Sequence, residues 1–225
     1  MIVENLEKVY NTSSEKVVAL SDFSYKFEKG KFYAIMGHSG SGKSTLIKIL
    51  GLMDGLTSGR YVINDADVSS LNDNELAYLR MNNIGFVFQD YKLDENLKAY
   101  ENVILPMLIN DKVDKSKRKE IAYDLLKKVG LIDRANHFPK EISGGEQQRV
   151  CIARALANNP DYILCDEPTG NLDEDNEFKI LDILKKLSEN GKCVIVVSHS
   201  NEIVKYADEV LVLKNGKLVK NNEVE

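Results

Sequence analysis

The sequence predicts an α/β fold with a mainly parallel sheet, an antiparallel β flank and an inserted helical subdomain. Apolar runs of four to six residues alternate with longer helical patterns, as in parallel-sheet proteins. Half-buried strand patterns precede the first fully apolar run, and strand patterns are absent from about residue 90 to 160. We therefore expect a single domain over residues 1–225, with its core at about 1–89 and 161–225 and the helical subdomain at about 90–160.

The N-terminal part of the chain is predicted to form the antiparallel flank. Residues Ile2 to Val9 and Ala19 to Phe27 mix apolar and polar side chains in the way typical of strands with one buried face. The turn sequence Glu28-Lys29-Gly30 follows them, and a further short strand is expected at Arg60 to Ile63. These strands are expected to lie beside the central sheet.

The central sheet is predicted from runs that are apolar throughout, because a strand covered on both faces does not alternate. The clearest runs are Phe32 to Met36, Ile84 to Phe88, Tyr162 to Cys165 and Cys193 to Ser198. Helices are expected in the inserted subdomain at Ser116 to Val129 and Gly144 to Asn158. Near the end of the chain, the Asn215-Gly216 pair predicts a hairpin between Glu209 to Lys214 and Lys217 to Lys220.

The composition is that of an ordinary globular protein. Hydrophobic residues make up 43% and charged residues 29%, with a formal net charge of −5, so a broadly basic surface that coats nucleic acid is not expected. The charged run at 111–120 mixes both signs and leads into a helical pattern. We interpret it as a solvated loop and helix start, and we expect no nucleic acid partner.

Cysteine usage and the lengths of the apolar runs predict a location inside the cell. The three cysteines, Cys151, Cys165 and Cys193, lie in apolar segments without CxxC spacing, so we expect reduced core residues rather than disulfides or zinc ligands. The first residues do not resemble a secretory signal, and no run approaches the roughly 18 apolar residues of a membrane helix. Any membrane role is expected to depend on a partner.

A phosphate-binding loop is predicted directly after the strand Phe32 to Met36. The next residues fit the pattern G-x-x-x-x-G-K-[ST] and lead into a helix; the predicted nucleotide-binding set is Gly37, His38, Ser39, Gly40, Ser41, Gly42, Lys43, Ser44 and Thr45. Glycines let backbone N–H groups close around phosphate oxygens, and the helix N-terminus adds its positive dipole end. Lys43 is expected to reach the β- and γ-phosphates and Ser44 to bind Mg²⁺. His38 is given no catalytic role.

Two carboxylates follow the apolar strand Tyr162 to Cys165, at the edge where open α/β sheets bind their ligands. Asp166 is expected to hold Mg²⁺, directly or through water, and Glu167 to polarise the attacking water. Together with the phosphate loop, this pair predicts a hydrolase of nucleoside triphosphates.

The residues Ser143, Gly144, Gly145 and Glu146, followed by Gln147-Gln148-Arg149, indicate the kind of hydrolase. Taken alone, they form either a second phosphate-binding helix N-terminus or a simple helix cap. Together with the phosphate loop and the carboxylate pair, they resemble the signature of the ABC ATPases, with Glu146 at the position where Gln is commonest. The resemblance implies the RecA-like P-loop NTPase architecture of an ABC ATPase fold, and ATP and Mg²⁺ as cofactors. The chain is then one ABC-type nucleotide-binding domain with ATP hydrolase activity coupled to transport.

The same resemblance implies further site residues. Gln89, which closes the strand at 84–88, resembles the Q-loop glutamine that contacts Mg²⁺ and water. Asp173 ends the D-loop-like sequence Gly170-Asn171-Leu172-Asp173, and His199 resembles the switch histidine that contacts the γ-phosphate. Tyr10 is the expected aromatic platform for adenine, with Tyr25 and Tyr33 as alternatives.

The resemblance also implies partners. In this family two nucleotide-binding domains join head to tail, with ATP between the glycine loop of one and the Ser-Gly-Gly signature of the other. A homodimer and a separate integral membrane permease are therefore expected, with the chain cytoplasmic and peripheral on the inner face of the cell membrane. The permease is expected to dock in the segment from Tyr91 to Glu101.

The segments at 86–103 and 168–173 most resemble the lipoprotein-release, macrolide-exporter and antimicrobial-peptide branch of the ABC transporters. This branch implies that the chain powers export of, or resistance to, a peptide, lipoprotein or drug. An alternative with the same motifs is mechanical signalling or cell-division regulation through a membrane partner. A soluble ATPase of DNA repair or translation is disfavoured, because the chain has neither a long coiled coil nor a second cassette. The substrate and the direction of transport are not encoded in such a subunit.

Overall fold

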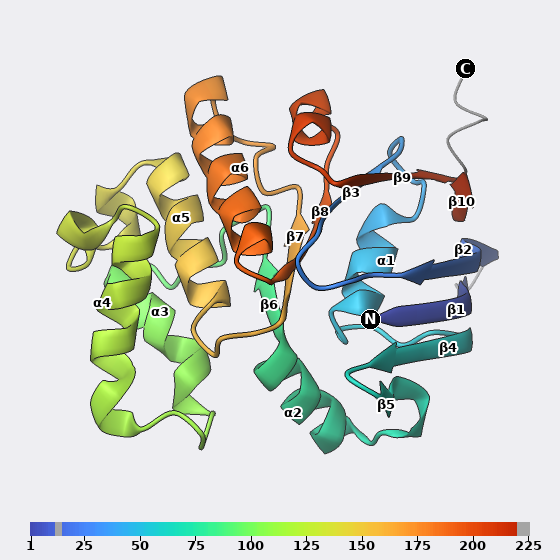
Figure 1. Ribbon diagram of the computed structural model, residues 1–225, viewed down its shortest axis with the longest axis horizontal. Helices are drawn as coiled ribbons and strands as arrows, with labels where there is room; N and C mark the ends of the chain where they lie inside the picture. The colour runs from blue at the N-terminus through green and yellow to red at the C-terminus, as the bar shows by residue number, and fades with distance from the viewer. Residues whose placement is uncertain (12–14, 220–225) are drawn as a thin grey trace.

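The computed structural model describes residues 1–11 and 15–219, which form two sheets with helices around them (Figure 1). The larger sheet has the strand order β10-β9-β3-β8-β7-β6. Its strands are β3 (Phe32–Met36), β6 (Ile84–Val87), β7 (Tyr162–Asp166), β8 (Cys193–Val197), β9 (Glu209–Lys214) and β10 (Lys217–Val219). Neighbouring strands run parallel except in the β9–β10 hairpin. The predicted parallel sheet and hairpin are confirmed up to Val219; Lys220 lies outside the described residues.

The antiparallel flank is a second sheet with the order β2-β1-β4-β5. It contains β1 (Ile2–Asn11), β2 (Lys16–Lys26), β4 (Ser58–Ile63) and β5 (Ala66–Asp67). The backbone N–H of Ser21 donates to the carbonyl of Gly216 at 2.9 Å, which ties this sheet to the hairpin of the larger one. Strand β5 was not predicted, because two residues are too few for a pattern.

The helices fall into two groups (Figure 1). Helices α3 (Ala99–Leu108), α4 (Arg118–Lys128) and α5 (Gly144–Ala155) pack together on one side of the molecule, in the region predicted to be helical. Helices α1 (Lys43–Leu50), α2 (Asp73–Asn83) and α6 (Glu174–Glu189) pack against strands of the larger sheet, and α5 also contacts β6. The sequence analysis named neither α2 nor α6. Helix α2 has no fully buried residue, and only Leu76 and Leu79 pack, partly buried, against a core. Helix α5 ends at Ala155 rather than at the expected Asn158.

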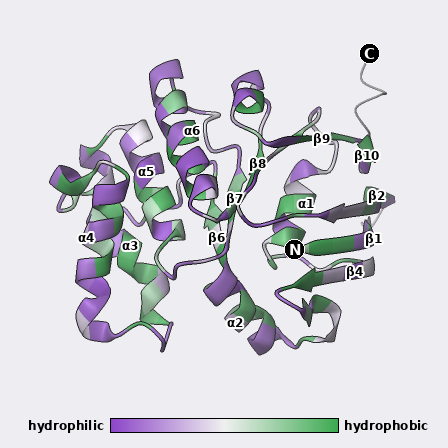
Figure 2. Cartoon of the chain, in the orientation of Figure 1, coloured by the Kyte–Doolittle hydropathy of each residue, from purple (hydrophilic) through white to green (hydrophobic). Residues whose placement is uncertain are grey.

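Two hydrophobic cores cover the two faces of the larger sheet. Along β3, Phe32 and Ala34 belong to the core shared with α3 to α6, whereas Tyr33 and Ile35 belong to the core shared with α1 and the flank. Figure 2 shows hydrophobic colour along the central strands and mixed colour on α4 and α6. The sheet is therefore covered on both sides, which explains its runs without alternation.

The described part of the chain contains no helix that is long and apolar enough to span a membrane. All three cysteines are buried, as expected of core residues. Burial raises the pKa of the Cys151 thiol to about 12, so it stays protonated at neutral pH.

Candidate functional site

The loop between β3 and α1 fits only glycine at two of its positions. Gly37 has φ +154°, and a Cβ there would lie 2.3 Å from the carbonyl oxygen of Leu213. Gly42 has φ +102°, and its Cβ would lie 2.4 Å from the carbonyl oxygen of Ala19. Both neighbours are backbone atoms that cannot turn aside. The glycines thus allow the loop to sit tightly between β9 and the flank.

Lys43 lies across this loop with its side chain almost fully buried. Its Nζ donates to the carbonyls of Gly37, at 2.7 Å, and His38, at 3.0 Å. Burial lowers the pKa of Lys43, and the carboxylates of Glu167 and Asp166 act against that shift. The ammonium group is thus held at the mouth of the loop, where it can exchange carbonyl partners for phosphate oxygens.

Ser44 and Asp166 meet beside the loop. The Ser44 hydroxyl donates to Asp166 Oδ1 at 3.5 Å, and Asp166 ends β7. Burial raises the pKa of Asp166, while Lys48, Ser44 and Lys43 act in the opposite direction. One hydroxyl and one carboxylate side by side are oxygen ligands of the kind that Mg²⁺ takes together with substrate phosphates, so these residues fit the predicted cation.

Glu167 and His199 form a close pair. Glu167 Oε2 accepts from the backbone N–H of His199, and Oε1 lies 3.1 Å from His199 Nε2. Glu167 adopts a left-handed backbone conformation, with φ +49°, and its N–H donates to the carbonyl of Val197 at 3.0 Å. This turn directs the carboxylate sideways from β7 to the end of β8. Both side chains line the same cleft as the phosphate loop.

The cleft has a volume of about 240 Å³ and is lined by most of the residues predicted for the phosphate loop, together with Glu167 and His199. Its described lining includes the loop from Ser39 to Thr45 with Glu167 and His199, and also Val17, Val18 and Ala19 of β2. The sequence analysis missed Val17 and Val18. Their exposure, at 41% and 57%, is unusual for valines, but only the fold shows that they border the loop.

Gln89 is exposed and follows β6. A Cβ on Gly170 would lie 3.4 Å from Gln89 Nε2 and 3.8 Å from Glu167 Cβ. The structure therefore brings Gln89 beside the turn that carries Glu167, as the motif order predicts.

Tyr10 lies in β1, opposite Val17, and not in a loop. Its hydroxyl donates to Asp54 Oδ2 at 2.6 Å, and Lys8 Nζ lies 4.7 Å from the ring centre. Burial and the Asp54 carboxylate raise the pKa of Tyr10, with a smaller opposing effect from the hydroxyl of Thr45. The ring thus stands near the start of α1. Tyr25 and Tyr33 instead pack with Phe27 in the core, which favours Tyr10 as the base platform.

The signature-like residues form a separate group at the start of α5. Ser143 Oγ accepts from the N–H of Glu146 at 3.3 Å, and Glu146 Oε2 accepts from the N–H of Ser143 at 2.8 Å. Asp173 caps α6 by accepting from Asn176, whose side chain lies against Gly145. Among the described residues that line the cleft, none comes from 143–146. In Figure 1, α5 and α1 lie on opposite sides of β7 and β8.

Comparison with known proteins agrees with this arrangement. The profile of the ABC transporter family matches residues 20–170. The chain is 47% identical to an uncharacterized ABC transporter ATP-binding protein, MJ1508, of Methanocaldococcus jannaschii, over 96% of each chain. The chain therefore belongs to the ABC transporter family. Its fold and nucleotide chemistry are those of the ATP-binding cassette, and it is an ATP hydrolase.

Other ABC proteins place the chain within the family. It is 44% identical to the macrolide export ATP-binding/permease protein MacB of Bdellovibrio bacteriovorus, and the match covers 95% of this chain and 32% of that protein. The dimeric structure of the cassette MJ0796 superposes with a TM-score of 0.89 at 41% identity, covering 97% of this chain and 96% of that one. The same cassette has been solved as a dimer bound to ADP and Pi, after hydrolysis. MJ0796 is also from Methanocaldococcus jannaschii.

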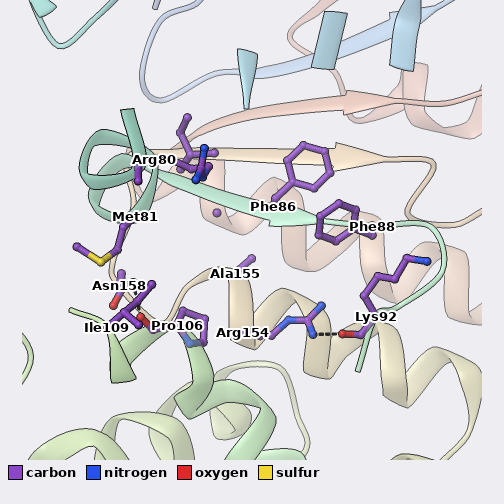
Figure 3. Close-up of a pocket in the computed structure, with 13 residues that line it drawn as sticks. Arg80, Met81, Phe86, Phe88, Lys92, Pro106, Ile109, Arg154, Ala155 and Asn158 are labelled. Atoms are coloured by element: carbon purple, nitrogen blue, oxygen red, sulfur yellow. Dashed lines mark hydrogen bonds between the residues drawn. The ribbon is translucent and has the colours of Figure 1, made fainter. Parts of the chain in front are cut away.

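A groove in this ABC cassette lies away from the phosphate cleft, between α2, β6, α3 and α5 (Figure 3). It has a volume of about 360 Å³ and a largely apolar lining that includes basic side chains. The basic groups are Arg80, Lys92 and Arg154, and Arg154 donates to the carbonyls of Tyr91 and Lys92. Lys92 belongs to the segment from Tyr91 to Glu101 in which docking was expected; the sequence analysis did not connect the other groove residues with docking.

Proposed function

We propose that this ATPase works as a head-to-tail homodimer that powers a separate membrane permease. The observation that carries the proposal is the composition of the cleft at the start of α1. Its described lining contains the loop, Lys43 and Glu167 but none of the signature residues at the start of α5. Each chain therefore carries two different half-sites, the cleft at α1 and the signature at α5. In a head-to-tail dimer, the cleft of each chain would face the signature of the other, which would complete two sites. The dimeric form of the similar cassette MJ0796 supports this arrangement.

The chemistry proposed for each residue follows from its position. Lys43 would bind the β- and γ-phosphates, and Ser44 and Asp166 would hold Mg²⁺, which supplies charge neutralisation when bound. Glu167 would accept a hydrogen bond from the attacking water, with Gln89 beside it and His199 directed towards the γ-phosphate. Ser143 and Gly145 of the second chain would donate to the same phosphate, and Tyr10 would stack on adenine.

The proposed permease site is the groove in Figure 3. Ile109, which follows α3 directly, lines the groove and is 77% exposed, and the nearby Leu105 and Leu108 of α3 are 36% and 54% exposed. Exposed apolar side chains beside basic lining residues suit a short amphipathic helix with an acidic end. By this contact the chain would lie on the inner face of the membrane, as one nucleotide-binding domain. The similarity to MacB supports an export or resistance role for the transported molecule.

The test is Glu167→Gln. This variant should bind MgATP, turn over at least about a hundredfold more slowly, and accumulate as a dimer only when MgATP is present, because closure is stabilised by ATP that is not consumed. Analytical ultracentrifugation with and without MgATP measures the result, with Glu189→Gln at the far end of α6 as a matched control. A variant that stays monomeric at saturating MgATP would contradict the proposal.

The partner is tested with the same variant, tagged and purified from its native membranes with MgATP. A permease with a large extracytoplasmic domain is the expected co-purifying protein. A division or signalling protein would instead support mechanical regulation. The absence of any membrane protein would contradict the docking proposal.

A further inference from the structure

The signature of this chain carries a negative charge at the point where the proposed dimer must receive phosphate. Glu146 is the third residue of α5, and its carboxylate accepts from the N–H of Ser143. This bond, together with a smaller contribution from Arg134, lowers the pKa of Glu146. Glu146 is therefore charged at neutral pH. An anion at a helix N-terminus is favourable in the free chain, but it repels a second anion that approaches the same N–H groups.

Arg134 lies beside this carboxylate. It comes from the short turn Ile132–Arg134, which follows α4, and its Nε donates to Glu146 Oε1 at 3.1 Å. The two Glu146 oxygens thus have separate partners: Oε1 contacts Arg134 and Oε2 contacts the Ser143 backbone. These two contacts hold the Glu146 carboxylate against the backbone N–H of Ser143. The Ser143 hydroxyl accepts only a long hydrogen bond, 3.3 Å, from the Glu146 N–H.

We propose that Arg134 is a positioning residue of the ATPase, which neutralises Glu146 and holds its carboxylate away from the incoming γ-phosphate. The inference rests on the proposed head-to-tail dimer. In this proposal Arg134 contacts neither the nucleotide nor the attacking water, and it acts through Glu146. The Ser143 hydroxyl is then left to turn and donate to the phosphate, and the start of α5 keeps enough positive potential to bind it.

The effect should be small in the free chain and large in the closed dimer. The side chains of Arg134 and Glu146 are 47% and 20% exposed, and partly exposed ion pairs contribute little to folding. Dimer closure would exclude water and bring phosphate charge to the same helix end, where an unneutralised carboxylate costs more. Removing Arg134 should therefore weaken closure and leave folding and nucleotide binding by the monomer nearly unchanged.

The experiment is a double-mutant cycle in the Glu167→Gln protein. The MgATP-dependent dimer dissociation constant is measured for the parent, Arg134→Ala, Glu146→Gln and the double variant. Arg134→Ala should raise the constant about tenfold, and Arg134→Lys should restore part of the loss. The double variant should match Glu146→Gln, because a neutral amide needs no counter-ion.

Lys140→Ala is the matched control, since it removes the same charge from the neighbouring turn Pro139–Glu141 without touching the Arg134–Glu146 pair. An equal loss in this control would mean that net charge alone is responsible and would overturn the inference. The inference would also be overturned if Arg134→Ala dimerised like the parent. It would be overturned as well if Arg134→Ala weakened the dimer equally in the Glu146→Gln background. A parent that does not dimerise would overturn the proposed function itself.

Discussion

The helix starts of α1 and α5 both follow glycine-rich sequences, yet the structure prepares them differently. Helix α1 begins after Gly42, and no described side chain caps it. Helix α5 begins after Ser143, whose side chain and that of Glu146 cap each other's backbone. The first helix end therefore presents open N–H groups to a ligand, whereas the second already has partners within its own chain.

This difference indicates that the two helix ends bind phosphate at different stages. The open end at α1 is preformed for phosphate, so nucleotide can bind to one chain alone. The capped end at α5 must exchange contacts within its own chain for contacts with the phosphate of a nucleotide bound to the second chain. Its contribution to ATP binding therefore appears only when the dimer closes. The comparison predicts that changes at α1 weaken nucleotide binding by one chain, while changes at α5 weaken the dimer and leave that binding unchanged.

The largest expected effect is that of Lys43→Ala. This change removes the ammonium held at the loop mouth, and affinity for MgATP should fall about a hundredfold or more, the size expected for a charge-assisted contact with phosphate. Isothermal titration with MgATP measures the loss, and Lys186→Ala, at an exposed position in the last turn of α6, is the control. Undiminished binding or ATPase activity would contradict the assignment of the open end.

The two ends should also differ in their tolerance of a Cβ atom. Gly42→Ala places a side chain at φ +102° and 2.4 Å from a carbonyl oxygen, so the free energy of unfolding should fall by about 2–4 kcal/mol. At Gly144 the nearest atom is the Tyr91 hydroxyl oxygen, at 2.8 Å, which can move with its side chain. Gly144→Ala should change stability by less than about 1 kcal/mol. Urea unfolding compares the two, and equal losses would contradict the difference.

Ser143→Ala tests the capped end directly. The loss of the N-cap should cost about 1 kcal/mol of stability, and MgATP binding by the monomer should stay unchanged. In the Glu167→Gln protein, the MgATP-dependent dimer should weaken about tenfold. Ser143→Thr, which keeps the hydroxyl, should lie close to the parent in ultracentrifugation. A loss of monomer binding would mean that Ser143 serves the site in its own chain.

The smallest expected effect is that of Tyr10→Phe. The ring remains, but the 2.6 Å bond to Asp54 that orients it is lost, so KM for ATP should rise about threefold. Tyr10→Leu, which also removes the aromatic face, should raise KM about tenfold. Steady-state assays with ATP measure both changes. If Tyr10→Leu has no effect, the base platform is another residue.

Much of the site could be predicted because its residues are close in sequence to the elements that position them. The phosphate loop lies between β3 and α1, and Asp166 and Glu167 follow β7 directly. Parallel strands bring their carboxyl ends to one edge, so the order of motifs along the chain indicated that Lys43, Glu167 and His199 would meet. Helices α2 and α6 and strand β5 were not named. Helix α2 turns only the partly buried Leu76 and Leu79 towards a core, and β5 is too short for periodicity.

The sequence by itself determined the family, the α/β architecture and the residues proposed to touch ATP, because each depends on local patterns in which backbone geometry and chemistry are encoded together. Only the tertiary structure decided which distant segments share a surface. Val17 borders the phosphate loop, Arg134 pairs with Glu146, and Lys92 joins a groove with α2 and α3. Such contacts arise from how sheets and helices pack across the whole chain, and no local pattern records them.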